Sequence, residues 1–192
     1  MRTVVGSIAT WPSAGLLCLA TVMLLMALPL TTAMADEPVE GLGDTLRWLI
    51  PASGLAATVG LRDWEGTEQW CYSIGVGQAV TEILKSTVGE HRPNGSASSK
   101  SFPSGHTSGV FGGAAFIQQR YGWRYALPAY LGAAYTGWSR VELDRHYPHD
   151  VFAGAAVGVL SSYLFTTPYE ADRSVGLFYE EGTLGFQINW KW

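Results

Sequence analysis

Long apolar segments alternate with short polar breaks along the chain, and this pattern predicts a bundle of helices. Polar breaks fall at the segment DWEGTEQW and at the loop Asn94–Lys100, which reads NGSASSK. Between the breaks, apolar residues recur at helical spacing. These segments are Leu42–Leu61, Thr67 to about His91, a segment that starts at FPSGH and runs to Tyr121, Tyr125–Trp138 and Val151–Phe165. The sequence therefore predicts an all-α fold, a single helical bundle of about five to six helices.

Gly and Ala crowd the predicted helices, in runs such as GVFGGAAF, LGAAYTGW and FAGAAVGV. Small residues let helices approach closely, both in membranes and in tightly packed soluble bundles. The uncharged runs Trp48–Leu61 and Tyr125–Trp138 are shorter than the roughly 20 residues that a membrane span needs, although Val151–Tyr169 comes close. The pattern favours a periplasmic domain, with or without membrane association, over a chain that crosses the membrane several times.

The end of the chain follows a different period. Apolar residues alternate with polar or small ones from Leu184 to Trp192, as in a half-buried strand. Together with Ser174–Tyr179 and the turn Glu180-Glu181-Gly182, this segment predicts a short C-terminal β-hairpin over residues 174–192. An isolated hairpin is barely stable, so its apolar face needs a surface. The helical bundle is the simpler surface; a membrane or a partner is the alternative, because aromatic residues favour membrane interfaces.

The first 35 residues have the pattern of a secretory signal peptide. Arg2 is the only charged residue, Leu16–Leu30 is an apolar core, and Ala33-Met34-Ala35 forms a cleavage site of the A-x-A kind. An uncleaved membrane anchor is the alternative. The expected organisation is thus a signal peptide over residues 1–35, a helical domain over residues 36–173 and the hairpin tail, in a protein that is exported to the periplasm or faces it from the membrane.

Charge and cysteine content exclude several classes of function. The formal net charge is −4, and removal of the predicted signal peptide makes it −5, which gives no general attraction to nucleic acid. Of the two cysteines, Cys18 lies in the signal peptide, so Cys71 would have no partner for an internal disulfide. Cys71 lies in the apolar segment WCYSIGVG and is expected to be a buried small residue.

Residues 85–150 concentrate the groups suited to chemistry on an anion. The segments are KSTVGEHRP, FPSGH and SRVELDRHYPHD, and they contain three fixed cations, two imidazoles and one carboxylate: Lys85, Arg92, Arg140, His106, His146 and Asp150. Lys85 and Arg92 are seven residues apart, which on one helix places both on the same face, with Pro93 marking the helix end. Ser104 and Gly105 open the next helix, and a helix N-terminus binds phosphate well.

These three segments resemble the signature of the type-2 phosphatidic acid phosphatase family, whose fold and anion pocket are shared by vanadium haloperoxidases and bacterial non-specific acid phosphatases. The signature reads K-x6-RP, PSGH and SR-x5-H-x3-D, and the matching residues are Lys85, Arg92, Pro93, Pro103, Ser104, Gly105, His106, Ser139, Arg140, His146 and Asp150. The resemblance covers about a third of the chain, and neither the N-terminal segment nor the last twenty or so residues belong to it. His149 stands outside the signature and is expected to be exposed or to lie behind the site.

The resemblance assigns a role to each residue. Lys85, Arg92, Arg140, Ser104 and Gly105 would bind the phosphate. His146 would be the nucleophile that forms a phosphohistidine, with Asp150 holding its second nitrogen, and His106 would be the general acid. The chain has no H-E-x-x-H motif and no acidic cluster, and its fixed cations would repel a divalent ion, so no metal and no cofactor is expected.

The sequence therefore predicts a phosphatase for lipid phosphate monoesters or pyrophosphates, acting at a membrane surface. A broad-specificity acid phosphatase on soluble esters is the nearest alternative. A vanadate-dependent haloperoxidase is a further one, although those enzymes are generally much larger. A non-catalytic lipid-phosphate binding protein would need neither a nucleophile nor an acid, so a His146→Ala variant that keeps affinity and loses turnover would exclude it. The oligomeric state stays open.

Overall fold

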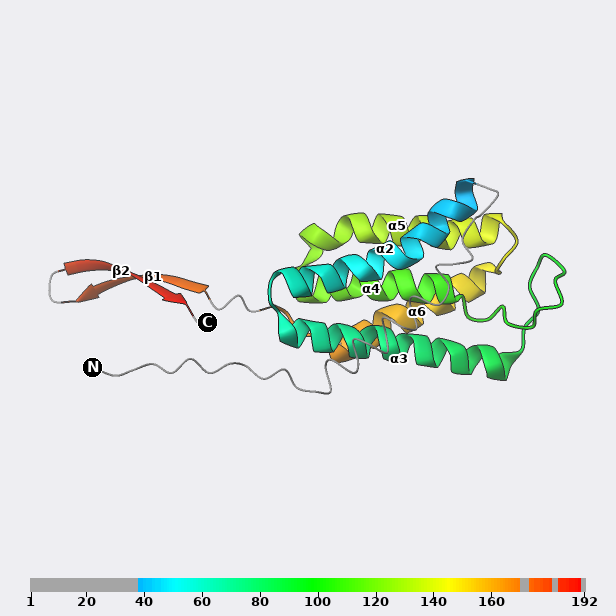
Figure 1. Ribbon diagram of the computed structural model, residues 1–192, viewed down its shortest axis with the longest axis horizontal. Helices are drawn as coiled ribbons and strands as arrows, with labels where there is room; N and C mark the ends of the chain where they lie inside the picture. The colour runs from blue at the N-terminus through cyan, green and yellow to red at the C-terminus, as the bar shows by residue number, and fades with distance from the viewer. Residues whose placement is uncertain (1–37, 170–172, 181–182, 191–192) are drawn as a thin grey trace.

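The structure, a computed structural model, describes residues 38–169, 173–180 and 183–190 (Figure 1). Five helices follow one another along the chain: α2 (Pro38–Gly60), α3 (Trp64–Val88), α4 (Gly105–Tyr121), α5 (Trp123–Glu142) and α6 (Pro148–Phe165). The all-α bundle is thereby confirmed. The helix bounds lie within about four residues of the predicted ones, and α4 ends at Tyr121 as predicted. The expected signal peptide lies outside the described residues.

Helix α4 occupies the centre of the bundle and contacts the other four helices (Figure 1). Its apolar residues are almost completely buried, including Val110, Ala114 and Phe116. Phe116 packs in one cluster with Trp70 of α3, whose indole nitrogen donates a hydrogen bond of 2.9 Å to the carbonyl of Pro51. Burying an aromatic ring of this size removes a large apolar area from water, so this cluster holds α2, α3 and α4 together. Cys71 is buried beside Trp70, as expected.

Small residues bring α4 and α6 into backbone contact. A Cβ atom on Gly158 would overlap the carbonyl oxygen of Ser108, and one on Gly154 would overlap that of Ser104. The Ser162 hydroxyl crosses the same contact and donates a hydrogen bond of 2.8 Å to the carbonyl of Gly112. The Gly and Ala runs of the sequence therefore lie where the helices of this bundle pack closely against one another. Among the helices described, none is both long and apolar enough to cross a membrane.

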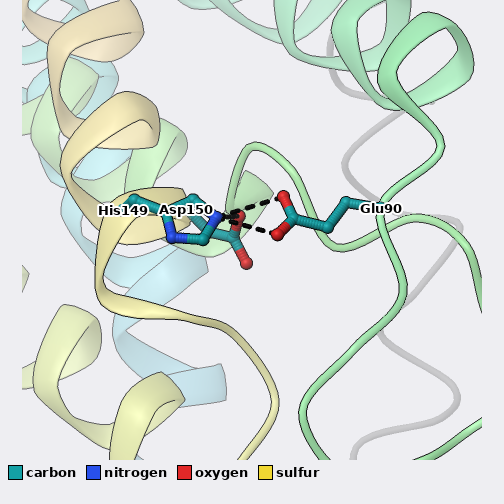
Figure 2. Close-up of side chains that lie close together, drawn as sticks. All are labelled: Glu90, His149 and Asp150. Carbon is teal, nitrogen blue, oxygen red and sulfur yellow. Dashed lines mark hydrogen bonds and ion pairs between the residues drawn. The ribbon is translucent and has the colours of Figure 1, made fainter.

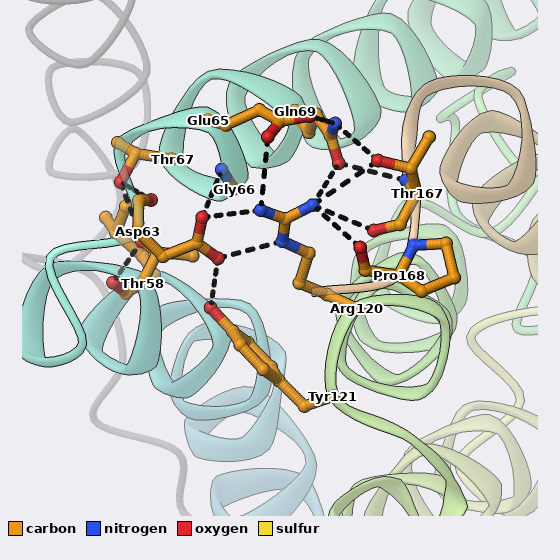
Figure 3. Close-up of polar contacts among 11 residues, drawn as sticks. Thr58, Asp63, Glu65, Gly66, Thr67, Gln69, Arg120, Tyr121, Thr167 and Pro168 are labelled. Atoms are coloured by element: carbon orange, nitrogen blue, oxygen red, sulfur yellow. Dashed lines mark hydrogen bonds and ion pairs between the residues drawn. The ribbon is translucent and has the colours of Figure 1, made fainter. Parts of the chain in front are cut away.

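A buried ion pair closes one end of the bundle (Figure 3). Asp63 lies in the turn between α2 and α3, and both of its carboxylate oxygens accept hydrogen bonds from the guanidinium of Arg120 at the end of α4, at 2.8 and 2.5 Å. Both side chains are only 3% exposed. Arg120 also donates to the carbonyl of Thr167, at 3.0 Å, so the pair fixes the chain that leaves α6.

The opposite end of the bundle gathers the starts of α2, α4 and α6 with the ends of α3 and α5 (Figure 1). Three helix N-termini at one end place several positive dipole ends close together, which favours an anion. All eight site residues expected from the sequence lie in or beside these helix ends. The fold thus brings together segments that are separated by as many as 65 residues in the sequence.

After α6 the chain forms two strands, β1 (Arg173–Glu180) and β2 (Thr183–Trp190), which pair antiparallel with Val175 opposite Ile188 and Leu177 opposite Phe186. Two paired strands bury little core of their own, so this pairing does not by itself establish a stable hairpin. The C-terminal hairpin and its packing surface therefore stay predictions.

Candidate active site

Lys85 and Arg92 reach the site from different elements, so the expectation that they share one helix face is wrong. Helix α3 ends at Val88 because Gly89 adopts the left-handed conformation, with φ of 67°. Lys85 is in the last turn of α3, and Arg92 lies in the loop that follows. A glycine at this position reverses the chain at little cost, which is how helices commonly end.

Lys85 and Arg92 form no ion pair with a carboxylate within residues 38–169. The ammonium group of Lys85 donates hydrogen bonds to the carbonyls of Pro103, at 2.6 Å, and Lys100, at 3.3 Å. Burial lowers the pKa of Lys85 to about 8, and the positive charge of Arg92 adds to this shift. The Nε atom of Arg92 is buried with no hydrogen-bond partner in the described part of the chain. Both side chains are thus available to an anion.

The start of α4 supplies neutral donors. Ser104 is fully buried and is the N-cap of α4, where its hydroxyl oxygen accepts hydrogen bonds from the backbone N–H of Thr107, at 3.4 Å, and from the Thr107 hydroxyl, at 3.0 Å. Gly105 is the first helical residue, and a Cβ atom there would touch Lys85. Ser104 therefore caps the helix, and its own hydroxyl proton and the free N–H groups of the first turn remain for a ligand.

His146 and Asp150 form the buried pair expected of a nucleophile and its orienting carboxylate. The Nδ1 atom of His146 lies 3.4 Å from Oδ2 of Asp150 and 3.4 Å from the hydroxyl of Ser101. The same carboxylate oxygen accepts hydrogen bonds from Ser101, at 2.6 Å, and from the backbone N–H of Tyr147, at 2.9 Å. These contacts hold the imidazole by Nδ1 and leave Nε2 for chemistry.

Burial lowers the pKa of His146 to about 4, and the positive charges of Lys85 and Arg92 add to this shift while Asp150 opposes it. A lowered pKa favours the neutral form of His146, which is the nucleophilic form of an imidazole.

A second imidazole, that of His149, lies beside Asp150 and faces Glu90 (Figure 2). Its Nε2 atom is 2.9 Å from one carboxylate oxygen of Glu90 and 3.3 Å from Oδ1 of Asp150, an oxygen that accepts no hydrogen bond from the residues that the structure describes. His149 is exposed, in agreement with its expected place behind the site. Glu90, His149 and Asp150 are also the one group of three metal-ligand side chains found within residues 38–169, with donor atoms within 4.8 Å of one another. One of these donors belongs to the carboxylate that holds His146, and Lys85 and Arg92 lie close by, so the surroundings suit an ion pair better than a divalent cation.

His106 shares a carboxylate with Arg140. Oδ1 of Asp44, on α2, lies 2.9 Å from Nε2 of His106 and 2.8 Å from the nearer nitrogen of Arg140. Burial lowers the pKa of His106 to about 4; the hydrogen bond to Asp44 opposes this shift, and the charges of Arg47 and Arg140 add to it. In the structure without a ligand, burial thus favours neutral His106, and the Asp44 carboxylate lies between His106 and Arg140 as an internal anion.

The structure brings all eight residues expected from the sequence to one end of the bundle: Lys85, Arg92, Ser104, Gly105, His106, Arg140, His146 and Asp150. Sequence reasoning missed three neighbours. Ser101 stands two residues before Pro103, close enough to the PSGH motif to have been considered. Asp44 and Arg47 lie on α2, about 60 residues before His106, and no motif marks them. Together these groups suit the transfer of a tetrahedral anion to a buried imidazole.

Comparisons with known proteins show which family the chain matches. The PAP2 superfamily matches residues 69–173. The lipid A 4′-phosphatase of Helicobacter pylori (strain J99 / ATCC 700824) is 31% identical over 164 residues, which cover 79% of this chain and 82% of that protein. The lipid A 1-phosphatase of Rhizobium johnstonii (strain DSM 114642 / LMG 32736 / 3841) is 30% identical and covers 74% of this chain and 72% of that protein. The undecaprenyl-diphosphatase BcrC of Bacillus subtilis (strain 168) is 33% identical over 72 residues, 36% of this chain and 35% of that protein. No solved structure gives a significant match.

Proposed function

This chain belongs to the PAP2 superfamily and is a phosphoric monoester hydrolase; from that premise we propose that it hydrolyses lipid phosphates through a phosphohistidine on His146, without a metal ion. The buried pair of His146 and Asp150 is the observation that carries the proposal. A site that only binds an anion has no use for an imidazole that is 4% exposed and held by a carboxylate at one nitrogen.

The residues support two chemical steps. In the first, Nε2 of His146 attacks phosphorus, the bond from phosphorus to the leaving oxygen breaks, and His106 gives its proton to that oxygen. Lys85, Arg92 and Arg140 stabilise the charge on the equatorial oxygens. In the second, His106 takes a proton from water, which attacks the phosphohistidine and releases phosphate. Asp150 stabilises the imidazolium in both steps.

Arg140 has to rearrange its contact with Asp44 when a phosphate binds. In the free site its guanidinium is bound to Asp44. A bidentate contact with the phosphate uses the same planar donors, so Arg140 either turns or shares its nitrogens between the two anions. Asp44 then remains with His106 and favours the protonated imidazole that the first step requires.

A lipid substrate is supported by the relatives and by the surface. Two of the relatives are named as lipid A phosphatases and one as an undecaprenyl-diphosphatase. Large apolar side chains are exposed on α5 and α6, among them Leu131 at 66%, Phe152 at 75% and Leu164 at 76%. Exposed apolar side chains in this number favour contact with a membrane surface or a lipid.

The proposal also covers the cellular location of the enzyme and the role of its C-terminal tail. The signal peptide over residues 1–35 would export the enzyme to the periplasm, where it would work at the membrane surface. The aromatic alternation of residues 174–192 suggests that the tail helps it dock there. A chain that ends at Ser174 and keeps the same ratio of lipid to soluble-ester activity would contradict this role for the tail.

The test is phosphate release by the purified protein in EDTA, from a micellar lipid phosphate and a soluble aryl phosphate side by side, with His146→Ala as the blank. We expect faster release from the lipid and none from the variant. Faster release from the soluble ester would favour a broad-specificity acid phosphatase. No release from either substrate would contradict the proposed function, and loss of activity in EDTA that zinc or magnesium restores would contradict its independence of metal.

A further inference from the structure

The imidazole of His149 is held on several sides, although its side chain is 56% exposed. Its Nε2 atom lies 2.9 and 3.1 Å from the two carboxylate oxygens of Glu90 (Figure 2). Its ring stacks on that of Tyr147, with centroids 5.3 Å apart and planes 8° from parallel, and the ring of Phe102 lies 6.1 Å away. Exposed ion pairs contribute little to stability, so the stability of the fold does not account for this arrangement.

The buried carboxylate of Asp150 gives the arrangement a purpose. Its Oδ2 atom faces His146 and accepts hydrogen bonds from Ser101 and from the backbone of Tyr147. Its Oδ1 atom is buried and accepts no hydrogen bond within the part of the chain that the structure describes, but Nε2 of His149 lies 3.3 Å from it. Carboxylates accept hydrogen bonds and do not donate them, so a ring nitrogen between two carboxylates carries a proton. The positive N–H edge of His149 therefore lies against Oδ1.

Glu90 connects the groups on the two sides of this carboxylate. Its backbone carbonyl accepts a hydrogen bond of 2.9 Å from the N–H of Ser101, whose hydroxyl contacts Oδ2 of Asp150. Its side chain holds His149, which contacts Oδ1. Glu90 thus fixes one neighbour of each oxygen. A carboxylate with a fixed neighbour at both oxygens keeps its orientation and its charge toward Nδ1 of His146.

We propose that His149 is a positioning residue for the reaction: held by Glu90, it fixes the carboxylate of Asp150 so that Oδ2 keeps facing His146. The proposal rests on the phosphatase function proposed above and adds to it two residues that belong to no motif. His149 contacts the oxygen of Asp150 that is not turned to His146, so it acts through Asp150. Positive charge develops on the imidazole of His146 when it bonds to phosphorus, and a fixed carboxylate stabilises that charge.

The test compares the wild-type protein with His149→Phe, which keeps a ring against Tyr147 and Phe102 and removes the N–H. Phosphate release from a micellar lipid phosphate should show a kcat about 3- to 10-fold lower, which is the effect of one lost contact to a buried charge. The groups that bind phosphate are unchanged, so the Ki of inorganic phosphate should change by less than about twofold.

The pH profile is a readout that a merely structural role would not move. Neutral His146 is the nucleophile, so kcat/KM falls as the pH drops through the pKa of His146, which burial lowers to about 4 and the charges of Lys85 and Arg92 lower further. His149→Phe removes a positive N–H and leaves Glu90 without its partner, and both changes make the surroundings of His146 more negative. The pKa of His146 should therefore rise, and the acid limb should move to higher pH by about half a unit. NMR titration of His146 measures the same pKa without turnover.

The charged and titratable groups around these two imidazoles define what the titration can report. Those that face His149 are Glu90, Asp150 and Tyr147, and those that act on His146 are Lys85, Arg92 and Asp150.

Three further variants keep the test decisive. His149→Gln retains an N–H donor and should keep more of kcat than His149→Phe. His91→Phe makes the same replacement at the other exposed histidine and should leave kcat, Ki and the acid limb unchanged. Glu90→Ala should lower kcat at neutral pH in the wild-type protein and change it by less than about twofold in the His149→Phe background, because Glu90 acts through His149.

The outcomes separate the inference from the proposed function. If the wild-type protein releases phosphate and His149→Phe keeps its kcat and its acid limb, the role of His149 is refuted while the phosphatase function stands. A fall in kcat with a matching rise in Ki would mean that His149 supports the whole site, which also refutes it. If the wild-type protein releases no phosphate, the proposed function fails. An equal pKa of His146 in the wild-type protein and His149→Phe refutes the inference whatever the activity.

Discussion

His106 should take up a proton when an anion binds. This coupling between anion binding and protonation follows directly from the electrostatics of the site. The perturbation is the addition of sulfate to the free protein at pH 6. Sulfate has the shape and charge of a phosphate dianion and does not titrate in this range. Every proton taken up on binding therefore goes to the protein.

The structure gives the size of the effect. Burial lowers the pKa of His106 from 6.5 to about 4, so about 1% of the imidazole is protonated at pH 6 in the free protein. Protonating it there costs about 2.7 kcal/mol, at 1.36 kcal/mol for each pKa unit. One negative charge about 4 Å away contributes roughly 4 kcal/mol at an effective dielectric constant of 20. The attraction between a bound dianion and protonated His106 thus exceeds the free-energy cost of protonation, and the pKa of His106 should rise by two units or more.

Proton uptake can be measured by calorimetry of sulfate binding in buffers with different ionisation enthalpies, and the pKa of each histidine by NMR titration with and without sulfate. We expect close to one proton per site at pH 6, and loss of this uptake in His106→Gln. Uptake that persists in His106→Gln would assign the proton to another group, such as His146. Sulfate binding without any proton uptake would refute the electrostatic account of the general acid.

Three further predictions concern the groups around this centre. Asp44→Asn removes the carboxylate that supports protonated His106, so turnover of an alkyl phosphate should fall about tenfold or more, whereas p-nitrophenyl phosphate, whose leaving group needs no acid, should be affected less. Because the pKa of Lys85 is about 8 in the free enzyme, kcat/KM should fall as the pH rises through about 8, and Lys85→Arg should remove this alkaline limb of the pH profile. Arg120→Met leaves the buried carboxylate of Asp63 without its counter-ion, with hydrogen bonds only from Gly66 and Tyr121, and should cost ~3 kcal/mol or more, which lowers Tm by about 10 °C in thermal unfolding followed by circular dichroism. An unchanged kcat at 20 °C would show that the Asp63–Arg120 ion pair has only a structural role. An unchanged Tm would contradict the stability that we assign to this ion pair.

The helices were predictable from the sequence because their apolar periodicity and their breaks are local signals. The five segments found in the pattern are the five helices of the bundle. The same reasoning failed at Arg92, because a seven-residue spacing assumes an unbroken helix. Gly89 adopts a positive φ and ends α3 before Arg92 is reached. The presence of a glycine in the sequence does not by itself predict whether that glycine will adopt a positive φ.

The motifs identified the groups of the site but not the surroundings that set their chemistry. Spacing allowed His146 and Asp150 to meet, and the structure places them together with Ser101. Asp44 and Arg47 had no such signal, because their contacts with His106 arise from the packing of α2 across the start of α4. The pKa of His106 could not be predicted from the sequence either, because burial lowers it and the hydrogen bond to Asp44 raises it, and both effects arise only in the packed structure.

The central claim is that His146 carries the phosphoryl group, and trapping that intermediate tests it most directly. The protein is mixed with a micellar lipid phosphate, stopped in alkali, where phosphohistidine survives, and digested for mass spectrometry. The account predicts a phosphoryl group on the peptide that contains His146 during turnover, and neither adduct nor phosphate release in His146→Ala. Continued phosphate release by His146→Ala, or a phosphoryl group on a different residue, would contradict it.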